Sequence, residues 1–344
     1  MKKLKEIKVL YLGNKLRRYG FTPTGVETLG HNLSELTNMI TASDKKNKFF
    51  RLLDMIFTLI KNRNDINLVL IDTYSGSAFY YAFIISIMCR MLDVKYVPIL
   101  RGGDLFKRLD ENKFLSNNIF NNSFTNISPS NFIKENFNKK GYKIRIIPNF
   151  IDLEFYPYLH RSSCSPSLLW VRSFHEIYNP QMAILVLNEL LKEFPNANLC
   201  MVGPDKDGSL NDCVKLSNKL NIQGSVNFTG ILKKEEWVKK AKEYDIFLNT
   251  TNYDNLPVSI LEAMALGFPI VSTNAGGLSS FHKDKFDALI VEKEDFLTMT
   301  KNIKLLISDN SLSEKLSRNA RNKAEAFGWK ILKNKWKNLF LGLE

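Results

Sequence analysis

The chain has 344 residues, of which 48 are basic and 35 acidic, so its formal net charge is +13. Its 44% apolar and 24% charged residues are ordinary for a globular protein, which excludes a disordered, collagen-like or disulfide-dense chain. At roughly 100 to 200 residues per domain, the length predicts two domains, each with its own core.

The cysteines and the apolar runs indicate the compartment. The four cysteines stand singly, with no Cys-x-x-Cys pair, so we expect neither a disulfide framework nor a zinc site. The apolar run at 7–12 is too short for the core of a signal peptide. The longest apolar stretch, 78–89, has 12 residues where a membrane span needs about 20, and it predicts a buried helix. We therefore expect a cytoplasmic protein.

The positive charge lies mostly in the first half. Residues 1–160 hold 24 basic and 14 acidic side chains, whereas residues 161–344 hold 24 and 21. Such a half can bind nucleic acid, an anionic membrane surface or an anionic substrate. Because no helix-turn-helix, zinc-finger or aromatic RNA-binding pattern accompanies it, we expect no nucleic acid. We expect an anionic membrane surface as partner, at the inner face of the membrane; plain solubility is the alternative.

Short apolar runs alternate with helical patterns along the whole chain. In the first half, strands are predicted at 7–13, 67–72, 95–100, 123–128 and 143–148, with helical spacing at 25–39 and 130–140. In the second half, strands are predicted at 167–173, 197–203, 225–230, 245–250, 269–273 and 288–292. Buried strands separated by helices indicate parallel sheets with right-handed crossovers. The predicted fold class is α/β, with two doubly wound, Rossmann-like domains.

A break in the pattern falls near 150–166, where prolines and serines replace regular spacing. We therefore expect a first domain at 1–155 and a second at 156–325. The tail reads as two helices that meet at 327–329. Its last helix, within 326–344, is expected to pack back on the first domain.

The segment 252–277 is the most informative. A loop follows the strand that ends near Thr250, Pro257 suits a first helical position, and the predicted helix ends at Gly267. A helix N-terminus at the carboxyl edge of a parallel sheet binds anions through its free N–H groups. The segment therefore predicts a diphosphate site that needs no metal.

Two carboxylates flank this predicted site. Asp254 lies in the loop, and Glu262 follows eight residues later and points back toward that loop. One carboxylate could bind the hydroxyls of a ribose and the other those of a sugar. Alternatively, Asp254 only caps the helix and Glu262 is a surface residue.

Several motifs carry a resemblance to a known family. The pattern D-x7-E followed by AMALGFPIVSTNAGG resembles the E-x7-E signature of the retaining GT-B glycosyltransferases of family 4, also called glycosyl transferases group 1. Further stretches that resemble the family are KIRIIPNFIDLEFYP (143–157), LLWVRSFHE (168–176), MVGPDKDG (201–208) and SVNFTGILKKEE (225–236). The resemblance implies a GT-B architecture, with an acceptor-side and a nucleotide-sugar-binding domain facing across a cleft, and no cofactor besides the donor substrate.

The resemblance also implies roles in the second domain. By position, Glu262 matches the carboxylate that binds the ribose, Asp254 the one that meets the donor sugar, and Arg172 the arginine that stabilises the leaving phosphate. The backbone of Asn255, Leu256 and Val258 would face sugar and diphosphate, and Ile231 would pack on the base.

In the first domain the resemblance is weaker. TPTGVE (22–27) matches a Gly-Gly-Val-Glu loop, so the backbone of Thr24 and Gly25 would approach the diphosphate; an ordinary turn is the alternative. Arg101, in ILRGGDL, would be a cation facing the cleft. Alternatively, this loop is a turn in which Asp104 caps the next helix.

The chain departs from the family in four places. Asp254 replaces a longer glutamate, Thr24 replaces a glycine, and Ser280 stands where many relatives have a glutamate. No lysine lies between Arg172 and Lys192, where relatives place a phosphate-binding lysine. Arg101 or His175 would have to replace it, or catalysis would be slow.

A D-x-D pattern, Asp205 and Asp207, is found in metal-dependent glycosyltransferases. Here it follows a predicted strand in a loop that resembles the family's turn, so no metal is expected.

The resemblance implies a retaining, metal-independent transferase that moves a sugar from a UDP- or GDP-linked donor to a glycan or lipid-linked acceptor, in cell-surface polysaccharide synthesis. Two alternatives stay open. The missing lysine is consistent with a catalytically inactive nucleotide-binding partner protein. A phosphorylase or epimerase on the same fold would share the ribose-binding Glu262.

Overall fold

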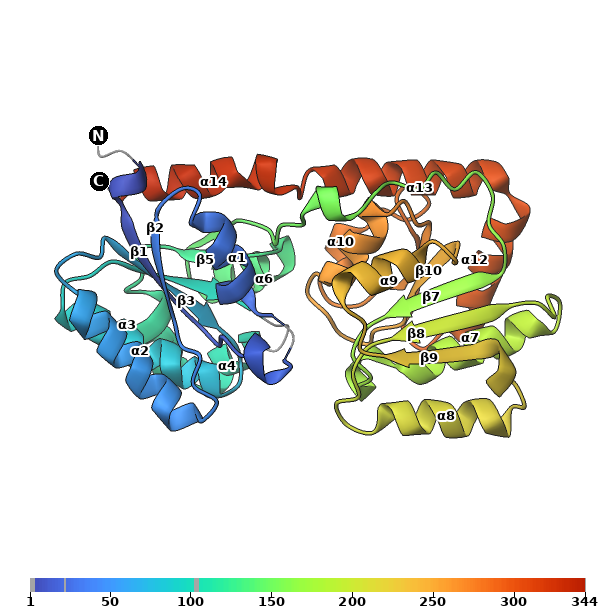
Figure 1. Cartoon of the computed structure of the whole chain (residues 1–344), viewed down its shortest axis with the longest axis horizontal. Coiled ribbons are helices and arrows are strands. Elements are labelled where there is room, and N and C mark those ends of the chain that lie inside the picture. The colour runs from blue at the N-terminus through green and yellow to red at the C-terminus, as the bar shows by residue number, and fades with distance from the viewer. Residues whose placement is uncertain (1–3, 22, 102–104, 344) are drawn as a thin grey trace. The chain divides into compact units, whose positions relative to one another are not determined.

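The computed structural model describes residues 4–21, 23–101 and 105–343 (Figure 1). The chain divides into two compact units, and each has its own sheet and core. The first unit comprises Met1–Phe150 and Trp329–Glu344, and the second comprises Ile151–Gly328.

The first unit contains a six-stranded sheet in the order β2-β1-β3-β4-β5-β6, in which all neighbouring strands are parallel. Its strands are β1 (Lys8–Leu12), β2 (Asn38–Ala42), β3 (Leu68–Thr73), β4 (Tyr96–Leu100), β5 (Asn126–Ser128) and β6 (Ile144–Ile146). A strand lies at each of the five positions predicted for this half.

The strand β2 corrects the sequence prediction, which gave one helix over 25–39. The helix α1 (Gly25–Leu33) ends earlier, and Asn38–Ala42 pairs with β1 instead. This edge strand is only partly buried. Because its short apolar run lacks clear alternation, it could not be separated from the helical pattern before it.

Helices cover both faces of the first sheet. One face packs against α2 (Lys48–Asn62), α3 (Ser77–Met91), α4 (Leu105–Glu111), α5 (Lys113–Phe120) and α6 (Asn131–Asn138). The other packs against α1 and α14 (Trp329–Leu341). Leu10 and Leu12 of β1 belong to the first core and Val9 and Tyr11 to the second, because successive strand residues point to opposite faces.

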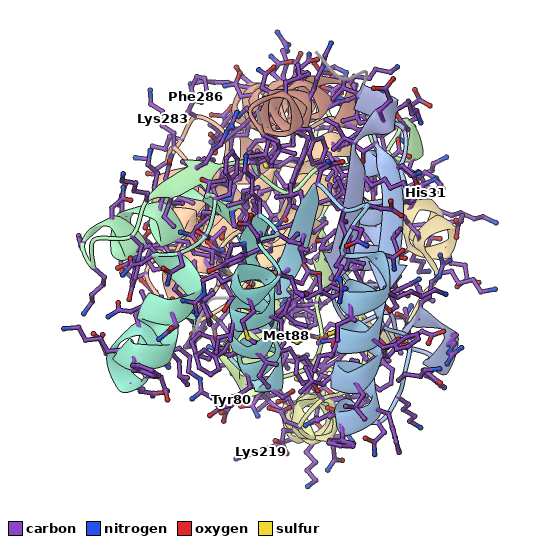
Figure 2. All side chains as sticks on the ribbon, turned by 90° about the vertical axis from the view of Figure 1, so that its left-hand side faces the viewer. His31, Tyr80, Met88, Lys219, Lys283 and Phe286 are labelled. Atoms are coloured by element: carbon purple, nitrogen blue, oxygen red, sulfur yellow. The ribbon has the colours of Figure 1, made fainter. Side chains whose placement is uncertain are left out.

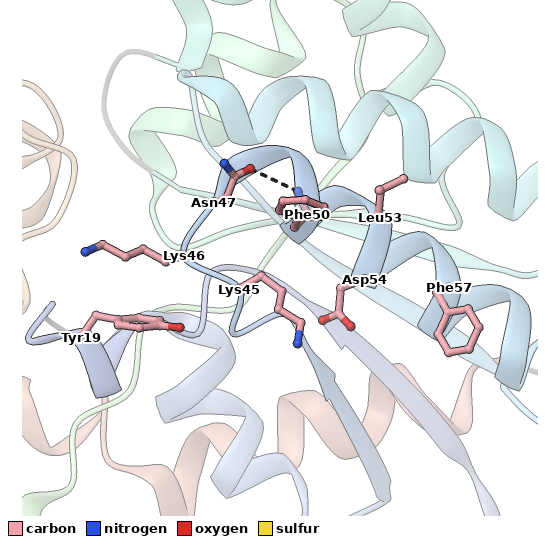
Figure 3. Close-up of a pocket in the computed structure, with 8 residues that line it drawn as sticks. All are labelled: Tyr19, Lys45, Lys46, Asn47, Phe50, Leu53, Asp54 and Phe57. Atoms are coloured by element: carbon pink, nitrogen blue, oxygen red, sulfur yellow. Dashed lines mark hydrogen bonds between the residues drawn. The ribbon is translucent and has the colours of Figure 1, made fainter.

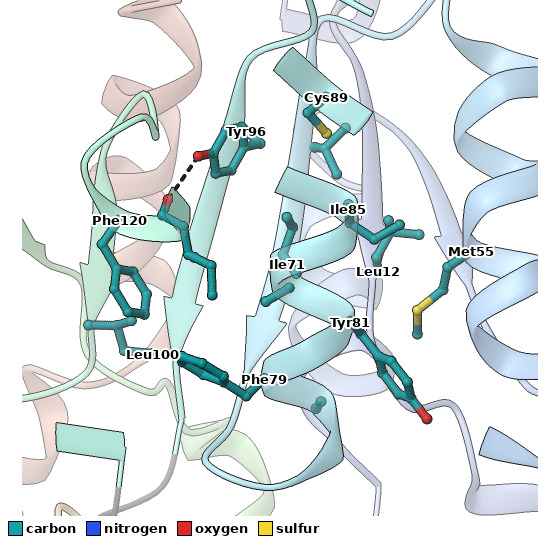
Figure 4. Packing of buried hydrophobic residues seen from close by; sticks show 14 of the residues in the cluster. Leu12, Met55, Ile71, Phe79, Tyr81, Ile85, Cys89, Tyr96, Leu100 and Phe120 are labelled. Carbon is teal, nitrogen blue, oxygen red and sulfur yellow. Dashed lines mark hydrogen bonds between the residues drawn. The ribbon is translucent and has the colours of Figure 1, made fainter. Parts of the chain in front are cut away.

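Figure 4 shows part of the larger core, where Leu12, Ile71 and Leu100 of the strands lie beside Phe79 and Ile85 of α3. The first unit faces the viewer in Figure 2, where side chains occupy the space between its helices and its sheet. Of the described helices, none combines the length and the apolar character needed to cross a membrane.

The second unit contains a six-stranded parallel sheet in the order β12-β11-β10-β7-β8-β9. Its strands are β7 (Ser167–Val171), β8 (Asn198–Val202), β9 (Val226–Gly230), β10 (Ile246–Asn249), β11 (Ile270–Thr273) and β12 (Leu289–Val291). All six lie where the sequence predicted strands.

Helices also cover both faces of the second sheet. They are α7 (Pro180–Leu191), α8 (Ser209–Lys219), α9 (Lys234–Ala241), α10 (Val258–Ala265), α11 (Leu278–Phe281), α12 (Phe296–Ser308) and α13 (Asn310–Glu325). Short 3-10 helices lie at Leu4–Glu6 and Arg17–Tyr19 in the first unit, and at Leu153–Phe155, Glu176–Tyr178 and Gln223–Ser225 in the second. The helices α7 and α12 pack on one face, and α9 and α10 on the other.

The strand order creates one switch point in each sheet. In the first, β1 lies between β2 and β3; in the second, β7 lies between β8 and β10. Loops that leave neighbouring strands at such a point diverge, and this opens the crevice where doubly wound proteins bind ligands. The fold class predicted from the strand pattern is confirmed.

Candidate functional site

Arg172 and Asp254 meet at the switch point of the second sheet. Arg172 directly follows β7, and Asp254 lies in the loop after β10. Their side chains form an ion pair between Nη2 and Oδ2, and they are 19% and 14% exposed. Two residues 82 positions apart in the sequence, both predicted for the site, are thus in direct contact.

The guanidinium of Arg172 has an N–H group that is not used by the described residues. Its Cζ lies 4.3 Å from the centre of the Tyr178 ring. Burial lowers the pKa of Arg172, whereas Tyr178 and Glu262 act in the opposite direction. Its Nε is buried and has no hydrogen-bond partner among the described residues. A buried cation with an unused N–H group is suited to bind an anionic ligand.

Two glycines hold the backbone of the Asp254 loop. Gly276 has a φ of +59°, and a Cβ there would lie 2.0 Å from the carbonyl oxygen of Asp254. A Cβ on Gly277 would lie 1.9 Å from the carbonyl oxygen of Asn255, and the Gly277 N–H donates to the Asp254 carbonyl at 2.8 Å. Only glycines allow this approach, which explains the Gly-Gly pair at the end of the sequence motif.

Glu262 lies on α10 and is partly buried. The Tyr156 hydroxyl donates a hydrogen bond to its Oε1. Burial raises the pKa of Glu262, whereas Tyr156, Lys234 and Arg172 act in the opposite direction. The carboxylate is therefore in electrostatic contact with the cation that also binds Asp254.

The helix α10 begins at Val258, and Pro257 precedes it in an extended conformation. The sequence prediction took Pro257 as the first helical residue and so began the helix one residue too early. No described side chain caps this N-terminus, because Asp254 accepts a hydrogen bond from the Asn255 N–H instead.

Two arginines bind the other end of α10. Arg161 donates to the Leu266 carbonyl at 2.8 Å, and Arg321 donates to the Ala265 carbonyl at 2.6 Å. Cations at a helix C-terminus complement its dipole. The helix thus has its negative end neutralised, while its positive end faces the loop that holds Asp254.

The remaining predicted residues of the second unit lie around these groups. Asn255 and Leu256 are buried, whereas Val258 is exposed at the start of α10. Ile231 follows β9 and is 68% exposed, which is unusual for an isoleucine and leaves it accessible to a ligand.

In the first unit, Gly25 and Arg101 lie together. A Cβ on Gly25 would lie 2.3 Å from Nη2 of Arg101. Thr24 caps α1, and its hydroxyl donates to the Asn14 carbonyl at 2.7 Å. Thr22, Gly102, Gly103 and Asp104 lie outside the described residues, so the alternative in which Asp104 caps the next helix stays a prediction.

Arg101 is bound by groups that the sequence analysis missed. Its Nε lies 3.0 Å from Oδ1 of Asp72, its Nη1 donates to Asn149 at 2.6 Å, and its Nη2 donates to the Tyr11 hydroxyl at 3.2 Å. Burial alone would lower the pKa of Arg101, but Asp72 and Tyr11 raise it. Asp72 also accepts from the Val26 N–H at 3.1 Å, so it joins Arg101 to the start of α1.

The polar residues of the loops after β7 and β8 serve local structure. His175 accepts a hydrogen bond from the Ile177 N–H and lies 3.7 Å from Asp207. Asp205 and Asp207 accept hydrogen bonds from backbone N–H groups at the start of α8, at 3.0 and 3.1 Å. Ser280 donates to the Gly277 carbonyl at 3.1 Å. Residues 4–21, 23–101 and 105–343 contain no group of three or more His, Cys, Asp or Glu side chains arranged to hold a metal.

Solved structures define the class of fold. Sucrose-phosphate synthase from Thermosynechococcus elongatus superposes with a TM-score of 0.82, at 15% identity, over 98% of this chain and 99% of that one. The Anabaena protein HepE, solved with UDP and glucose, gives 0.75 at 14% identity, over 98% and 100%. The chain therefore has the GT-B fold.

A family model matches part of the chain. Residues 163–323 match the model of the family described as glycosyl transferases group 1. The match lies within the second unit, where the motifs that resemble this family are densest.

Two curated relatives are glycosyltransferases. A UDP-Gal:alpha-D-GlcNAc-diphosphoundecaprenol alpha-1,3-galactosyltransferase of Escherichia coli is 28% identical over 221 residues, which are 58% of this chain and 54% of that enzyme. The lipopolysaccharide core biosynthesis glycosyltransferase LpsE of Rhizobium meliloti is 29% identical over 136 residues, or 38% and 37%. The chain thus spans about half the length, or less, of these curated relatives.

Proposed function

We propose that the protein is a retaining, metal-independent glycosyltransferase that moves a sugar from a UDP- or GDP-linked donor to a glycan or lipid-linked acceptor. The observation that carries the proposal is the contact of Arg172 with Asp254 at the switch point, beside Glu262 and the uncapped start of α10. A nucleoside-diphosphate sugar can use each of these groups. The cation and the free N–H groups suit its diphosphate, and the two carboxylates suit its hydroxyls.

Each residue has a role in this proposal. Glu262 accepts the ribose hydroxyls and Asp254 those of the donor sugar. The diphosphate lies at the start of α10, near the backbone of Asn255, Leu256 and Val258, and the base packs on Ile231. In the transfer, the bond from the sugar C1 to the diphosphate breaks, and a new bond forms to the acceptor hydroxyl. The proton of that hydroxyl passes to the leaving phosphate oxygen on the same face, while Arg172 stabilises the growing negative charge.

Because the family's phosphate-binding lysine is missing, Arg172 has to supply more of the positive charge at the diphosphate. Arg101 and His175 were the expected substitutes, but Arg101 is bound by Asp72, and His175 lies beside Asp207. We assign Arg101, with Thr24 and Gly25, to the first unit's side of donor binding. There its guanidinium lies so close to residue 25 that only a glycine, without a Cβ, fits at that position.

The relatives support the donor and acceptor classes. The Escherichia coli relative is described as using UDP-Gal and a diphosphoundecaprenol-linked acceptor. We propose an acceptor of this kind, in cell-surface polysaccharide synthesis. The basic first half of the chain then docks the protein on an anionic membrane, at the cytoplasmic face.

Binding without turnover is the second candidate. The observation that favours it is the ion pair itself, since the charge of Arg172 is compensated by that of Asp254. A donor that binds as proposed must replace the contact between Arg172 and Asp254 with contacts to itself. A non-catalytic protein could keep this ion pair.

One set of measurements on the full chain separates the candidates. UDP- and GDP-sugars are titrated by calorimetry against wild type and Glu262→Ala, and turnover is followed with a lipid-extract acceptor. We expect nucleotide binding that Glu262→Ala weakens by about 1.5 to 3 kcal/mol, the range for hydrogen bonds to a charged group. The product should keep the anomeric configuration of the donor, as seen by NMR. Binding with no turnover favours the second candidate, and an inverted product excludes a retaining reaction.

A further inference from the structure

The helix α2 of the first unit has two apolar faces. Its inward face buries Met55 and Leu59, and Arg51 lies buried one turn before them. Its outward face also carries large apolar side chains, where a surface helix of a globular protein is normally polar. These exposed side chains are Phe49, Phe50, Leu53, Phe57 and Ile60.

The outward residues form a continuous stripe. Phe50, Leu53, Phe57 and Ile60 follow the spacing of one helix face, and Phe50 and Phe57 are 60% and 64% exposed. The stripe borders a hollow of about 560 Å³, which Tyr19 and Lys46 also line (Figure 3). Contiguous exposed apolar surface of this kind marks a site of interaction.

Basic residues lie at both ends of this stripe. Lys45, Lys46 and Lys48 precede or begin α2, and Lys61 and Arg63 end it; all five are exposed. Residues 44–65 contain six basic and three acidic side chains.

Two of the three acids in this segment are paired with bases outside it, and the third, Asp54, lines the hollow. Asp44 forms an ion pair with Arg18 at 2.8 Å, and Asp65 pairs with Lys8 at 3.2 Å. Both partners lie outside the segment 44–65, so two of its three acids are neutralised by other bases. The exposed lysines at each end of α2 therefore keep their positive charge.

We propose that this outward face of α2 is the element that docks the protein on an anionic lipid bilayer. The helix lies in the plane of the interface, its phenylalanines enter the boundary between headgroups and acyl chains, and the lysines at its ends contact anionic headgroups. The proposal deepens the proposed function, since it rests on a lipid-linked acceptor at a membrane surface.

A second copy of the chain suits this face less well. In a two-fold symmetric contact, each α2 would lie on the same helix of the other copy. An antiparallel pair would then bring Lys45 and Lys46 of one copy near Lys61 and Arg63 of the other. Like charges at an interface are unfavourable, and lysine is depleted from the cores of protein interfaces. An anionic surface matches both ends at once.

The test uses the full chain and two kinds of vesicle, phosphatidylcholine alone and phosphatidylcholine with phosphatidylglycerol. We expect the wild type to sediment with the anionic vesicles. Phe50→Ser combined with Phe57→Ser should lower the partition at least tenfold, because two large apolar side chains no longer enter the interface. Ile331→Ser is the matched control, since this exposed residue lies on α14, which covers the opposite face of the sheet. It should bind as wild type.

A second pair of variants tests the charge. Lys45→Glu with Lys46→Glu should abolish most binding at low salt, whereas Lys335→Glu with Lys337→Glu, on α14, changes the net charge equally and should bind as wild type. All variants should keep the Tm of the wild type, which shows that they are folded. Equal binding of the phenylalanine variant and wild type would overturn the proposal. So would a dimer that this variant dissociates, because the face would then belong to a second copy.

The two proposals fail in different measurements. A wild type that ignores anionic vesicles but transfers sugar to a soluble acceptor removes the docking surface and leaves the transferase. A wild type that binds these vesicles through α2 but shows no turnover keeps the surface and removes the transferase.

Discussion

At the scale of single residues, the proposed function requires a donor to compete with the ion pair of Arg172 and Asp254. Both side chains are partly buried, and each charge has the other as its partner. A donor that brings a diphosphate to Arg172 and sugar hydroxyls to Asp254 replaces one pair of partners by another. On this proposal, the ion pair holds both side chains in place until a donor replaces their mutual contact.

Replacement of the arginine is expected to affect turnover more than affinity. Arg172→Ala should lower kcat by about 10² to 10³, which corresponds to roughly 2.7 to 4 kcal/mol, because the phosphate charge grows in the transition state. Steady-state kinetics with the donor varied measures this effect. Arg318→Ala, at an exposed position on α13, serves as control. An unchanged kcat with a raised KM would limit Arg172 to ground-state binding.

A buried histidine, His282, is expected to make the stability of the protein depend on pH. Nδ1 of His282 lies 2.9 Å from Asp287, whose other oxygen pairs with Lys323 at 2.8 Å. Burial lowers the pKa of His282. Burial alone would raise the pKa of Asp287, but hydrogen bonds from His282 and Lys323 lower it.

Both shifts destabilise the fold as the pH falls. Below about pH 6.5 the unfolded chain protonates its histidine while the folded protein keeps it neutral, so unfolding takes up a proton. Asp287 adds to this loss at lower pH, as its carboxylate becomes protonated. We expect the Tm to fall between about pH 7.5 and pH 5. The slope should be shallower in His282→Asn; equal slopes in both proteins would contradict this assignment.

The site was only partly predictable from its residues. Arg172, Asp254 and Glu262 could be named because they stand at strand ends and in a spaced motif. Tyr156, which donates to Glu262, lies 106 residues away in the sequence. No local pattern reports such a contact. The same holds for Asp72, although its position at the end of a buried strand was a signal that could have been used.

At the scale of elements, α10 and the glycine pair that follows β11 act together. The helix presents its uncapped N-terminus, and the glycines fix the loop that precedes it. The sequence pattern predicted this helix and its end, because Gly267 and the next strand delimit it. The half-buried strand β2 escaped prediction, since its short apolar run has no clear period.

A single methyl group should disturb this arrangement. Gly276→Ala places a Cβ against the Asp254 carbonyl in a left-handed conformation, so we expect a loss of roughly 3 to 5 kcal/mol in the free energy of unfolding. Nucleotide binding should weaken as well. Gly208→Ala is the matched control, because its φ is +92° but no atom lies within 4 Å of the added Cβ. The control should lose only about 1 to 2 kcal/mol. Similar losses in both variants, measured by urea unfolding, would show that contact with Asp254 has no effect.

The helix N-terminus also bears on metal use. If α10 and Arg172 neutralise the diphosphate, EDTA should leave the rate of transfer within about twofold of the untreated value. The rate is measured with EDTA and again after manganese is added. Activity that EDTA abolishes and manganese restores would assign a metal to the diphosphate.

At the scale of the whole molecule, the alternation of strands and helices was sufficient to predict two doubly wound sheets. All six strands of the second unit were found. Both faces of that sheet are covered, and every strand except the partly exposed β9 is largely buried. What the pattern cannot report is which buried charges face each other across a sheet edge. Those contacts depend on the strand order, which brings β7 beside β10 and β1 beside β3.

The path of the last helix changes how the chain can be divided. Because α14 supplies Trp336, Leu339 and Phe340 to a core of the first unit, the second unit is an insertion within the chain of the first. Its two ends are adjacent, since the Ile151 N–H donates to the Phe327 carbonyl at 2.9 Å. The segment 151–328 can therefore be excised by two cuts at neighbouring points, whereas a chain shortened at 328 loses part of the core formed by its first residues. Any truncation meant to isolate the first unit has to include α14.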